Sequence, residues 1–188
     1  MRKLIAWDMI SLDGIFSRDD GDLDWFVFEE EIERYILSTQ SGIDTVLFGR
    51  KTWAGMKDYW KAADGTLADR MNRVEKVVFS RSGTNPDWEN SRIVTGDVAA
   101  EVNRIKAKPG TDIFVFGSAD LTKTLIREGL IDEYRIGINP VILGGGVPFF
   151  KGGEPEHKLK LTEAKPLKSG VVILHYVPEG ARTATAPA

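Results

Sequence analysis

A short apolar run ends in a turn that carries two cations and a hydroxyl group. The run "TVLF" at residues 45–48 is followed by Gly49, Arg50, Lys51 and Thr52. Arginine can bind two phosphate oxygens at once, lysine supplies a mobile point charge, and glycine lets the backbone approach a ligand closely. These residue types favour a phosphate site. The alternative is an ordinary strand-to-helix turn with solvated charges.

Two further apolar runs end in similar turns. The run "KVVFS" at residues 76–80 ends in Ser80 and leads into Arg81, and "IFVF" at 113–116 leads into Gly117, Ser118 and Ala119. Ligands of open α/β sheets collect at the carboxyl ends of the strands, and free N–H groups at a helix start bind anions. Three such turns at neighbouring strand ends favour a ligand with several separated phosphates.

The elements that position these turns follow from the hydrophobic pattern. The three apolar runs are typical of strands buried on both faces, as in a parallel sheet. Helices are expected between them, with Asp24, Asp97 and Ser118 as N-caps. The first helix should turn Phe28 towards the core, and Gly129 should end the last helix.

After Leu130 the chain becomes rich in strands, with "DEYRIGINPVIL", "KLKLT" and "VVILHYV". This order predicts an α/β sandwich with a mostly parallel sheet and an antiparallel C-terminal edge. We expect one domain over residues 1–178. The small, polar and proline-containing segment at 179–188 is expected to be a flexible tail.

Composition excludes several classes of function. The 188 residues contain no cysteine, which excludes a disulfide framework, a zinc–thiolate site and a cysteine nucleophile. His157 and His175 lack ligand spacing, so no metal site is expected. The formal charge of -3 argues against nucleic acid, and no apolar run approaches the roughly 18 residues of a membrane span. Without a signal-peptide pattern, a cytoplasmic protein is expected.

Four motifs carry a resemblance to a known family: "SLDG", "FGRKTW", "IFVFGSADL" and "NPVILGGGVPFF". Together they resemble the dihydrofolate reductase-like superfamily, and within it the reductase domain of bifunctional riboflavin-biosynthesis deaminase/reductases. The resemblance spans about residues 3–177. It implies a stand-alone three-layer α/β/α domain that uses NADPH and forms a homodimer. P-loop, G-x-G-x-x-G and G-x-S-x-G motifs are absent, which disfavours other nucleotide and hydrolase folds.

The resemblance also assigns roles in cofactor binding. Arg50, Ser80 and Arg81 match positions that bind the adenosine 2′-phosphate, which would select NADPH over NADH. The pyrophosphate is expected to contact Gly49, Lys51, Thr52, Gly117, Ser118, Ala119 and Leu121.

At the reacting end, Asp13 of "SLDG" is the expected catalytic polar group beside the nicotinamide, although a plain turn would also suit an aspartate before a glycine. Asp24 is favoured as a helix cap over a catalyst. The glutamates of "FEEEIER" are expected to form a solvated helix face. The expected substrate-binding residues are Asp24, Trp25, Leu143, Gly144, Gly145 and Gly146.

The resulting hypothesis is a reductase similar to 5-amino-6-(5-phosphoribosylamino)uracil reductase, which transfers a hydride to a carbonyl or imine of a small pyrimidine-like or pterin-like substrate. Three alternatives remain. They are a dihydrofolate or pterin reductase, a non-catalytic NADPH-binding protein of the same fold, and a scaffold without a ligand.

Overall fold

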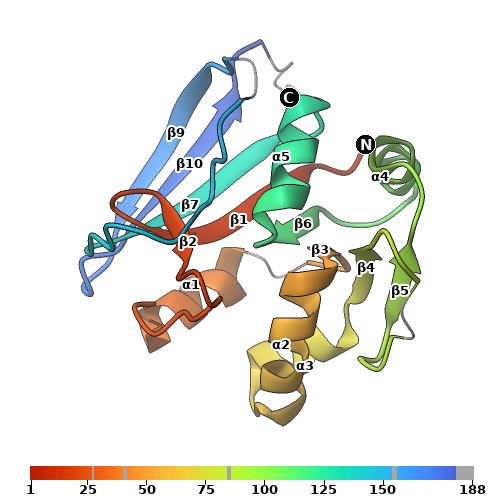
Figure 1. The fold of residues 1–188 in the computed structure, drawn as a ribbon, viewed down its shortest axis with the longest axis horizontal. Helices are drawn as coiled ribbons and strands as arrows, with labels where there is room; N and C mark the ends of the chain where they lie inside the picture. Colours follow the sequence, from red (N-terminus) through yellow and green to blue (C-terminus); the bar gives the residue numbers. More distant parts are fainter. Residues whose placement is uncertain (27, 40–41, 84–85, 154–155, 181–188) are drawn as a thin grey trace, which may run out of the picture.

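One large sheet organises the chain (Figure 1). The structure is a computed structural model that describes residues 1–26, 28–39, 42–83, 86–153 and 156–180. The sheet has eight strands in the order β5-β4-β3-β6-β1-β7-β10-β9. Its strands are β1 (Leu4–Ser11), β3 (Thr45–Gly49), β4 (Glu75–Phe79), β5 (Ser91–Val94), β6 (Ile113–Phe116), β7 (Glu133–Asn139), β9 (Leu159–Pro166) and β10 (Val172–Pro178).

The six strands from β5 to β7 run parallel, whereas β10 is antiparallel to β7 and β9 is antiparallel to β10. The three apolar runs noted above form β3, β4 and β6, with almost every residue buried. Strands with a neighbour on each side and helices over both faces need apolar side chains on both faces. The predicted parallel sheet with an antiparallel C-terminal edge is therefore confirmed.

Helices cover both faces of the sheet. α1 (Glu30–Thr39), α2 (Arg50–Ala62) and α3 (Thr66–Arg73) pack on one face, where the side chains of Ile5 and Trp7 join their core. α4 (Val98–Lys106) and α5 (Ala119–Arg127) pack on the other face, with Leu4 and Ala6. This alternation along β1 follows the period of two of a strand. The result is the expected three-layer sandwich.

The expected start of the first helix was wrong. α1 begins at Glu30, and Asp24 lies outside it, where its carboxylate accepts a hydrogen bond of 2.6 Å from Arg18 Nε. The Asp22 carboxylate accepts from the amide of Asp24, which stabilises a turn instead of a helix start. Phe28 consequently precedes α1 and is 40% exposed rather than on its core face.

Two other predicted helix boundaries are confirmed. Asp97 caps α4, because its carboxylate accepts a 2.7 Å hydrogen bond from the amide of Ala100. Gly129 follows α5 with φ of 61°, a conformation that glycine adopts at little cost.

A second, small sheet pairs β2 (Ile15–Ser17) with β8 (Val147–Pro148). At the other end of the fold, the Glu179 amide still donates to the Lys158 carbonyl at 2.8 Å, while residues 181–188 of the expected tail lie outside the described residues. Within the described ranges, no helix is long and apolar enough to cross a membrane.

Candidate functional site

A shared hydroxyl group joins two of the three predicted turns. Because β4, β3 and β6 are parallel neighbours, their carboxyl ends open at the same edge of the sheet. There the Ser118 hydroxyl donates to Thr52 Oγ1 at 2.7 Å and accepts from the Gly49 amide at 2.7 Å. Residues that are 66 and 69 positions apart in the chain thus form one connected site.

The glycines of these turns are needed for this close approach. A Cβ atom on Gly49 would lie 2.8 Å from Ser118 Oγ, and one on Gly117 would lie 2.8 Å from Thr52 Cγ2 and 2.9 Å from Phe16 Cζ. Gly117 also has φ of 57°, in the left-handed region. Any larger residue would push the two turns apart.

Two helix N-termini at this edge have no side-chain cap. Ser118 was expected to cap α5, but its side chain makes no cap hydrogen bond there because its hydroxyl is used by Gly49 and Thr52. α2 has no side-chain cap either. Two uncapped N-termini at one edge present amide groups and a partial positive charge to an anion. Ala119 and Leu121 are buried, so only their backbone can take part.

The third turn is closed on itself. The buried Ser80 hydroxyl donates to the Ser82 carbonyl and accepts from the Ser82 amide at 3.3 Å. Arg81, between them, is exposed. Ser80 thus shapes the turn, and Arg81 is its group free to reach a ligand.

Cations from two of the turns lower the pKa of a carboxylate at the start of α5. Asp120, at the start of α5, has a pKa below its ordinary value, chiefly because Lys151 Nζ bonds its carboxylate at 2.6 Å. The charges of Lys51 and Arg81 lower the same pKa further. Both side chains are exposed, as is Arg50. Positive charge from two strand ends therefore reaches the N-terminus of α5.

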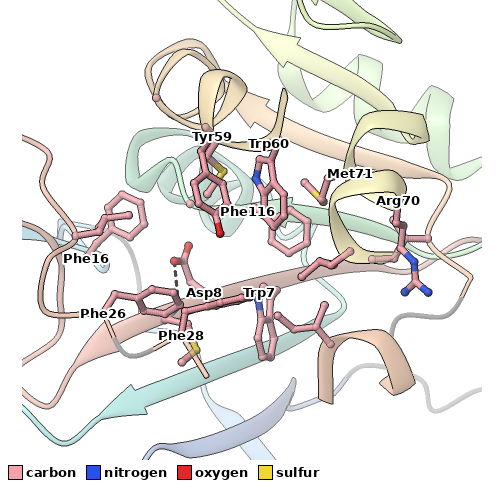
Figure 2. A pocket seen from close by; sticks show the side chains of 18 of the residues that line it. Trp7, Asp8, Phe16, Phe26, Phe28, Tyr59, Trp60, Arg70, Met71 and Phe116 are labelled. Atoms are coloured by element: carbon pink, nitrogen blue, oxygen red, sulfur yellow. Dashed lines mark hydrogen bonds between the residues drawn. The ribbon is translucent and has the colours of Figure 1, made fainter. Parts of the chain in front are cut away.

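An aromatic cavity of about 420 Å³ adjoins this edge (Figure 2). It is enclosed by the middle of β1, the end of β6, β2, helices α1, α2 and α3, and residues 23, 25, 26 and 28 before α1. Gly117 of the crowded turn and Phe16 of β2, which lies against it, both line the cavity, so the two regions are continuous. The aromatic lining residues are Trp7, Phe16, Trp25, Phe26, Phe28, Tyr59, Trp60 and Phe116.

Asp8 is the one carboxylate among the described lining residues of this cavity (Figure 2). Its side chain is 8% exposed, Oδ1 accepts from the Met9 amide at 3.0 Å, and Oδ2 has no partner among the described residues. Burial raises the pKa of Asp8 well above its usual range, which the nearby peptide groups of Met9 and Gly117 only partly oppose. Burial therefore favours the neutral, protonated form of Asp8.

Sequence reasoning missed both Asp8 and the cavity. The signal for Asp8 was an aspartate inside the otherwise apolar strand "LIAWDMIS". The register of β1 explains its setting: Trp7 pairs with Phe116, the last residue of β6, so Asp8 is level with the turn at Gly117. The cavity has no local signal, since its aromatic residues come from five separate segments.

Asp13 holds the loop that contains Leu143 and Gly144. Its carboxylate accepts from Ser11 Oγ at 2.6 Å and from the amides of Leu143 and Gly144 at 3.1 and 2.8 Å. These bonds, led by that of Ser11, lower its pKa to about 2. Asp13 is therefore an ionised acceptor, outside the cavity lining. Its expected place beside the reacting centre stays a prediction.

The glycine loop after β7, which contains Gly144, Gly145 and Gly146, packs closely against β2. A Cβ atom on Gly146 would lie 2.5 Å from the Ser17 carbonyl, whereas Gly144 and Gly145 have open space around them. None of these residues lines the cavity. Of the expected substrate-binding residues, only Trp25 does, and Asp24 is paired with Arg18 instead.

Comparison with known proteins identifies the family of the chain. The sequence matches the RibD C-terminal domain over residues 2–173. The chain belongs to the RibD C-terminal domain family. One relative is the uncharacterized protein YyaP of Bacillus subtilis (strain 168), 33% identical over 181 residues that cover 93% of this chain and 94% of YyaP.

Solved structures share the fold. A putative riboflavin biosynthesis protein from Shewanella sp. PV-4 aligns with a TM-score of 0.79 at 21% identity, over 94% of this chain and 99% of that one. A dihydrofolate reductase from Enterococcus faecalis, complexed with NADP(H), aligns with a TM-score of 0.62 at 17% identity, over 94% and 96% of the two chains. The expected dihydrofolate reductase-like fold is confirmed.

Proposed function

We propose that this member of the RibD C-terminal domain family is an NADPH-dependent reductase that transfers a hydride to a carbonyl or imine carbon of a small ring compound. The observation that carries the proposal is the Ser118 bridge to Gly49 and Thr52, which joins two anion-binding turns at the rim of the aromatic cavity. The NADP(H) complex of the Enterococcus faecalis neighbour supports the choice of cofactor.

The residues present fit a dinucleotide with several phosphates. The pyrophosphate would lie against the uncapped first turns of α2 and α5, where Lys51 adds a charge and Gly117 leaves room for close approach. Because the Gly49 amide is bonded to Ser118, Gly49 would serve by its small size rather than by its N–H. Arg50 and Arg81 would bind the 2′-phosphate.

NADPH, when bound, supplies a hydride from its nicotinamide ring. The chain itself holds the other reactant. Aromatic side chains such as Trp7 and Phe116 exclude water and stack on a flat ring. Positioning of two reactants can lower a barrier by about 7–11 kcal/mol. Asp13 would act through the loop at Leu143 and Gly144, which it holds in place.

For the substrate we propose a pyrimidine of the riboflavin-biosynthesis type, 5-amino-6-(5-phosphoribosylamino)uracil. One observation favours a second candidate, an unphosphorylated pterin or dihydrofolate. Among the described lining residues, Arg70 is the only cation, and its Nη1 donates to the Leu37 carbonyl at 3.5 Å. A substrate phosphate needs several positive or N–H groups, whereas a flat pterin ring needs mainly aromatic surface.

The test offers the purified protein both candidates with NADPH and follows the loss of nicotinamide absorbance. Turnover of the pyrimidine supports the riboflavin-type reaction, and turnover of dihydrofolate alone selects the second candidate. Binding of NADPH without turnover of either compound would indicate a cofactor-binding protein that has lost catalysis. Failure to bind NADPH at all would contradict the proposed function.

A further inference from the structure

The aromatic cavity contains two buried polar atoms that the fold leaves without partners. Asp8 Oδ2 and Trp25 Nε1 both lack a hydrogen-bond partner among the described residues, although the two side chains are only 8% and 9% exposed. A buried polar group without a partner destabilises the fold, and a ligand that bonds it removes this cost. Both residues line the cavity, so a ligand bound there lies next to both side chains.

The position of Asp8 relates it to the proposed cofactor turn. Trp7 pairs with Phe116 across β1 and β6, and β6 ends there, so on this side Asp8 is level with the turn at Gly117, while on its other side it pairs with Ile136 of β7. Phe16 touches the same turn and lines the cavity beside it. Asp8 thus lies where the proposed cofactor edge meets the space for the second reactant.

We propose that Asp8 is the catalytic proton donor: a neutral carboxylic acid that hydrogen-bonds an acceptor atom of a substrate whose flat, uncharged ring lies in the aromatic cavity. This inference rests on the proposed reductase function for its hydride. Trp25 Nε1 is the second donor available to such a substrate. Two donors and an aromatic wall select a planar compound with a carbonyl oxygen or imine nitrogen.

The proton and electron balance is simple. The substrate carbon of a C=O or C=N bond gains the hydride, and NADPH is oxidised to NADP⁺. The O or N atom gains the Asp8 proton as the Asp8 O–H bond breaks, which leaves an alcohol or amine and an Asp8 carboxylate. That carboxylate is then reprotonated from solvent, because burial disfavours its charged form.

In the part of the chain that the structure describes, no charged side chain bonds Asp8. From its own strand it meets the Met9 peptide, and from the turn after β6 it meets the Gly117 peptide; both lower its pKa less than burial raises it. The other titratable lining residues are Tyr59 on α2 and Arg70 on α3. Figure 2 shows Arg70 at the end of the cavity opposite Phe16.

The test uses two neutral aromatic probes of similar size, coumarin, which has a carbonyl acceptor, and naphthalene, which has none. Their affinities are measured by equilibrium dialysis from about pH 5 to about pH 9, a range that spans the raised pKa values of buried carboxyl groups. The wild-type protein is compared with Asp8→Asn, which has nearly the same shape and cannot lose a proton. The control is Asp58→Asn, an exposed change on α2.

We expect the wild-type protein and Asp58→Asn to bind coumarin about tenfold more weakly at high pH than at low pH, as one hydrogen bond is lost. Naphthalene should show a smaller change, and coumarin binding by Asp8→Asn should not depend on pH. A flat coumarin curve for the wild type, an unaltered curve for Asp8→Asn, or no coumarin binding would overturn the proposal. NADPH is absent from these mixtures, so the outcome is independent of cofactor binding.

Two further measurements complete the test. The infrared spectrum of the wild-type protein at neutral pH should contain a protonated carboxyl band that shifts when coumarin is added, which needs no variant to fold. With a compound that the enzyme turns over, Asp8→Asn should lower kcat about 10²-fold or more while its NADPH affinity stays unchanged. Absence of the band, or an unchanged kcat, would count against Asp8 as the donor.

Discussion

The conformation of the turn at residues 117–118 depends on a positive φ at both residues and on the Ser118 hydroxyl. Gly117 and Ser118 both have φ near 60°, which is common only for glycine. The serine tolerates this conformation while its hydroxyl joins the turns after β3 and β6. Sequence patterns indicated the two turns but not this bond, because a serine before a helix is usually a cap. The Ser118 hydroxyl reaches Gly49 and Thr52 because β3 and β6 are neighbours in the sheet, which places their turns side by side.

The crowding at Gly117 gives a stability prediction with a matched control. Gly117→Ala and Gly129→Ala both place a Cβ at φ near 60°, which costs about 1–2 kcal/mol. Gly129 has no atom within 4 Å of that Cβ, whereas at Gly117 two side chains lie within 2.9 Å. Urea denaturation should show Gly117→Ala to be the less stable variant by a further 1–3 kcal/mol or so. Equal losses would mean that the turn is not tightly packed.

Asp8 gives a prediction for stability against pH. An unfolded aspartate has a pKa of about 3.9, and the folded value is higher, so between the two values only the unfolded state releases the proton. Stability should therefore fall as pH rises through this window, by at most about 1.4 kcal/mol per pH unit. Urea midpoints measured across this range should lack that slope in Asp8→Asn, which should be more stable than the wild type at neutral pH. Parallel curves would show that Asp8 is ionised in the fold.

At the scale of elements, sequence patterns predicted the features that depend on residues close together in the chain. The apolar runs of β3, β4 and β6 and the cap at Asp97 could be read directly, because burial on both faces and capping each need particular residue types. The start of α1 could not. Trp25 is buried in the cavity wall, and the Asp22 turn and the Arg18 pair hold the segment before Glu30 out of the helix.

Two aspartates test this difference between a cap and a loop residue. Asp97→Ala should lower the free energy of unfolding by about 1 kcal/mol, since the first turn of α4 loses its acceptor. Asp24→Ala removes only an exposed pair with Arg18 and should leave helix content unchanged. Urea denaturation followed by circular dichroism measures both. A larger loss for Asp24→Ala would restore the helix boundary that the sequence suggested.

In the whole molecule, the parallel strands of the sheet end at one edge, where the exposed cations and the aromatic cavity are neighbours. The motifs at 49–52, 80–82 and 117–121 predicted the charged part, because each follows a strand within a few residues. The aromatic part could not be predicted, since Trp7 of β1, Trp60 of α2 and Phe28, which precedes α1, meet only in the folded chain. The expected homodimer stays a prediction. The C-terminal edge strand β9 presents Leu161, which is 48% exposed.

The most direct test of the central claim is a comparison of NADPH and NADH affinity by isothermal titration calorimetry. The wild-type protein should bind NADPH more tightly than NADH, and Arg50→Ala and Arg81→Ala should each weaken NADPH by about tenfold while changing NADH less. The control is Arg127→Ala, at the far end of α5, whose guanidinium pairs with Glu128 and which should bind as the wild type does. Equal losses for both nucleotides in the Arg50 and Arg81 variants would contradict a 2′-phosphate site there, and absence of NADPH binding would contradict the account as a whole.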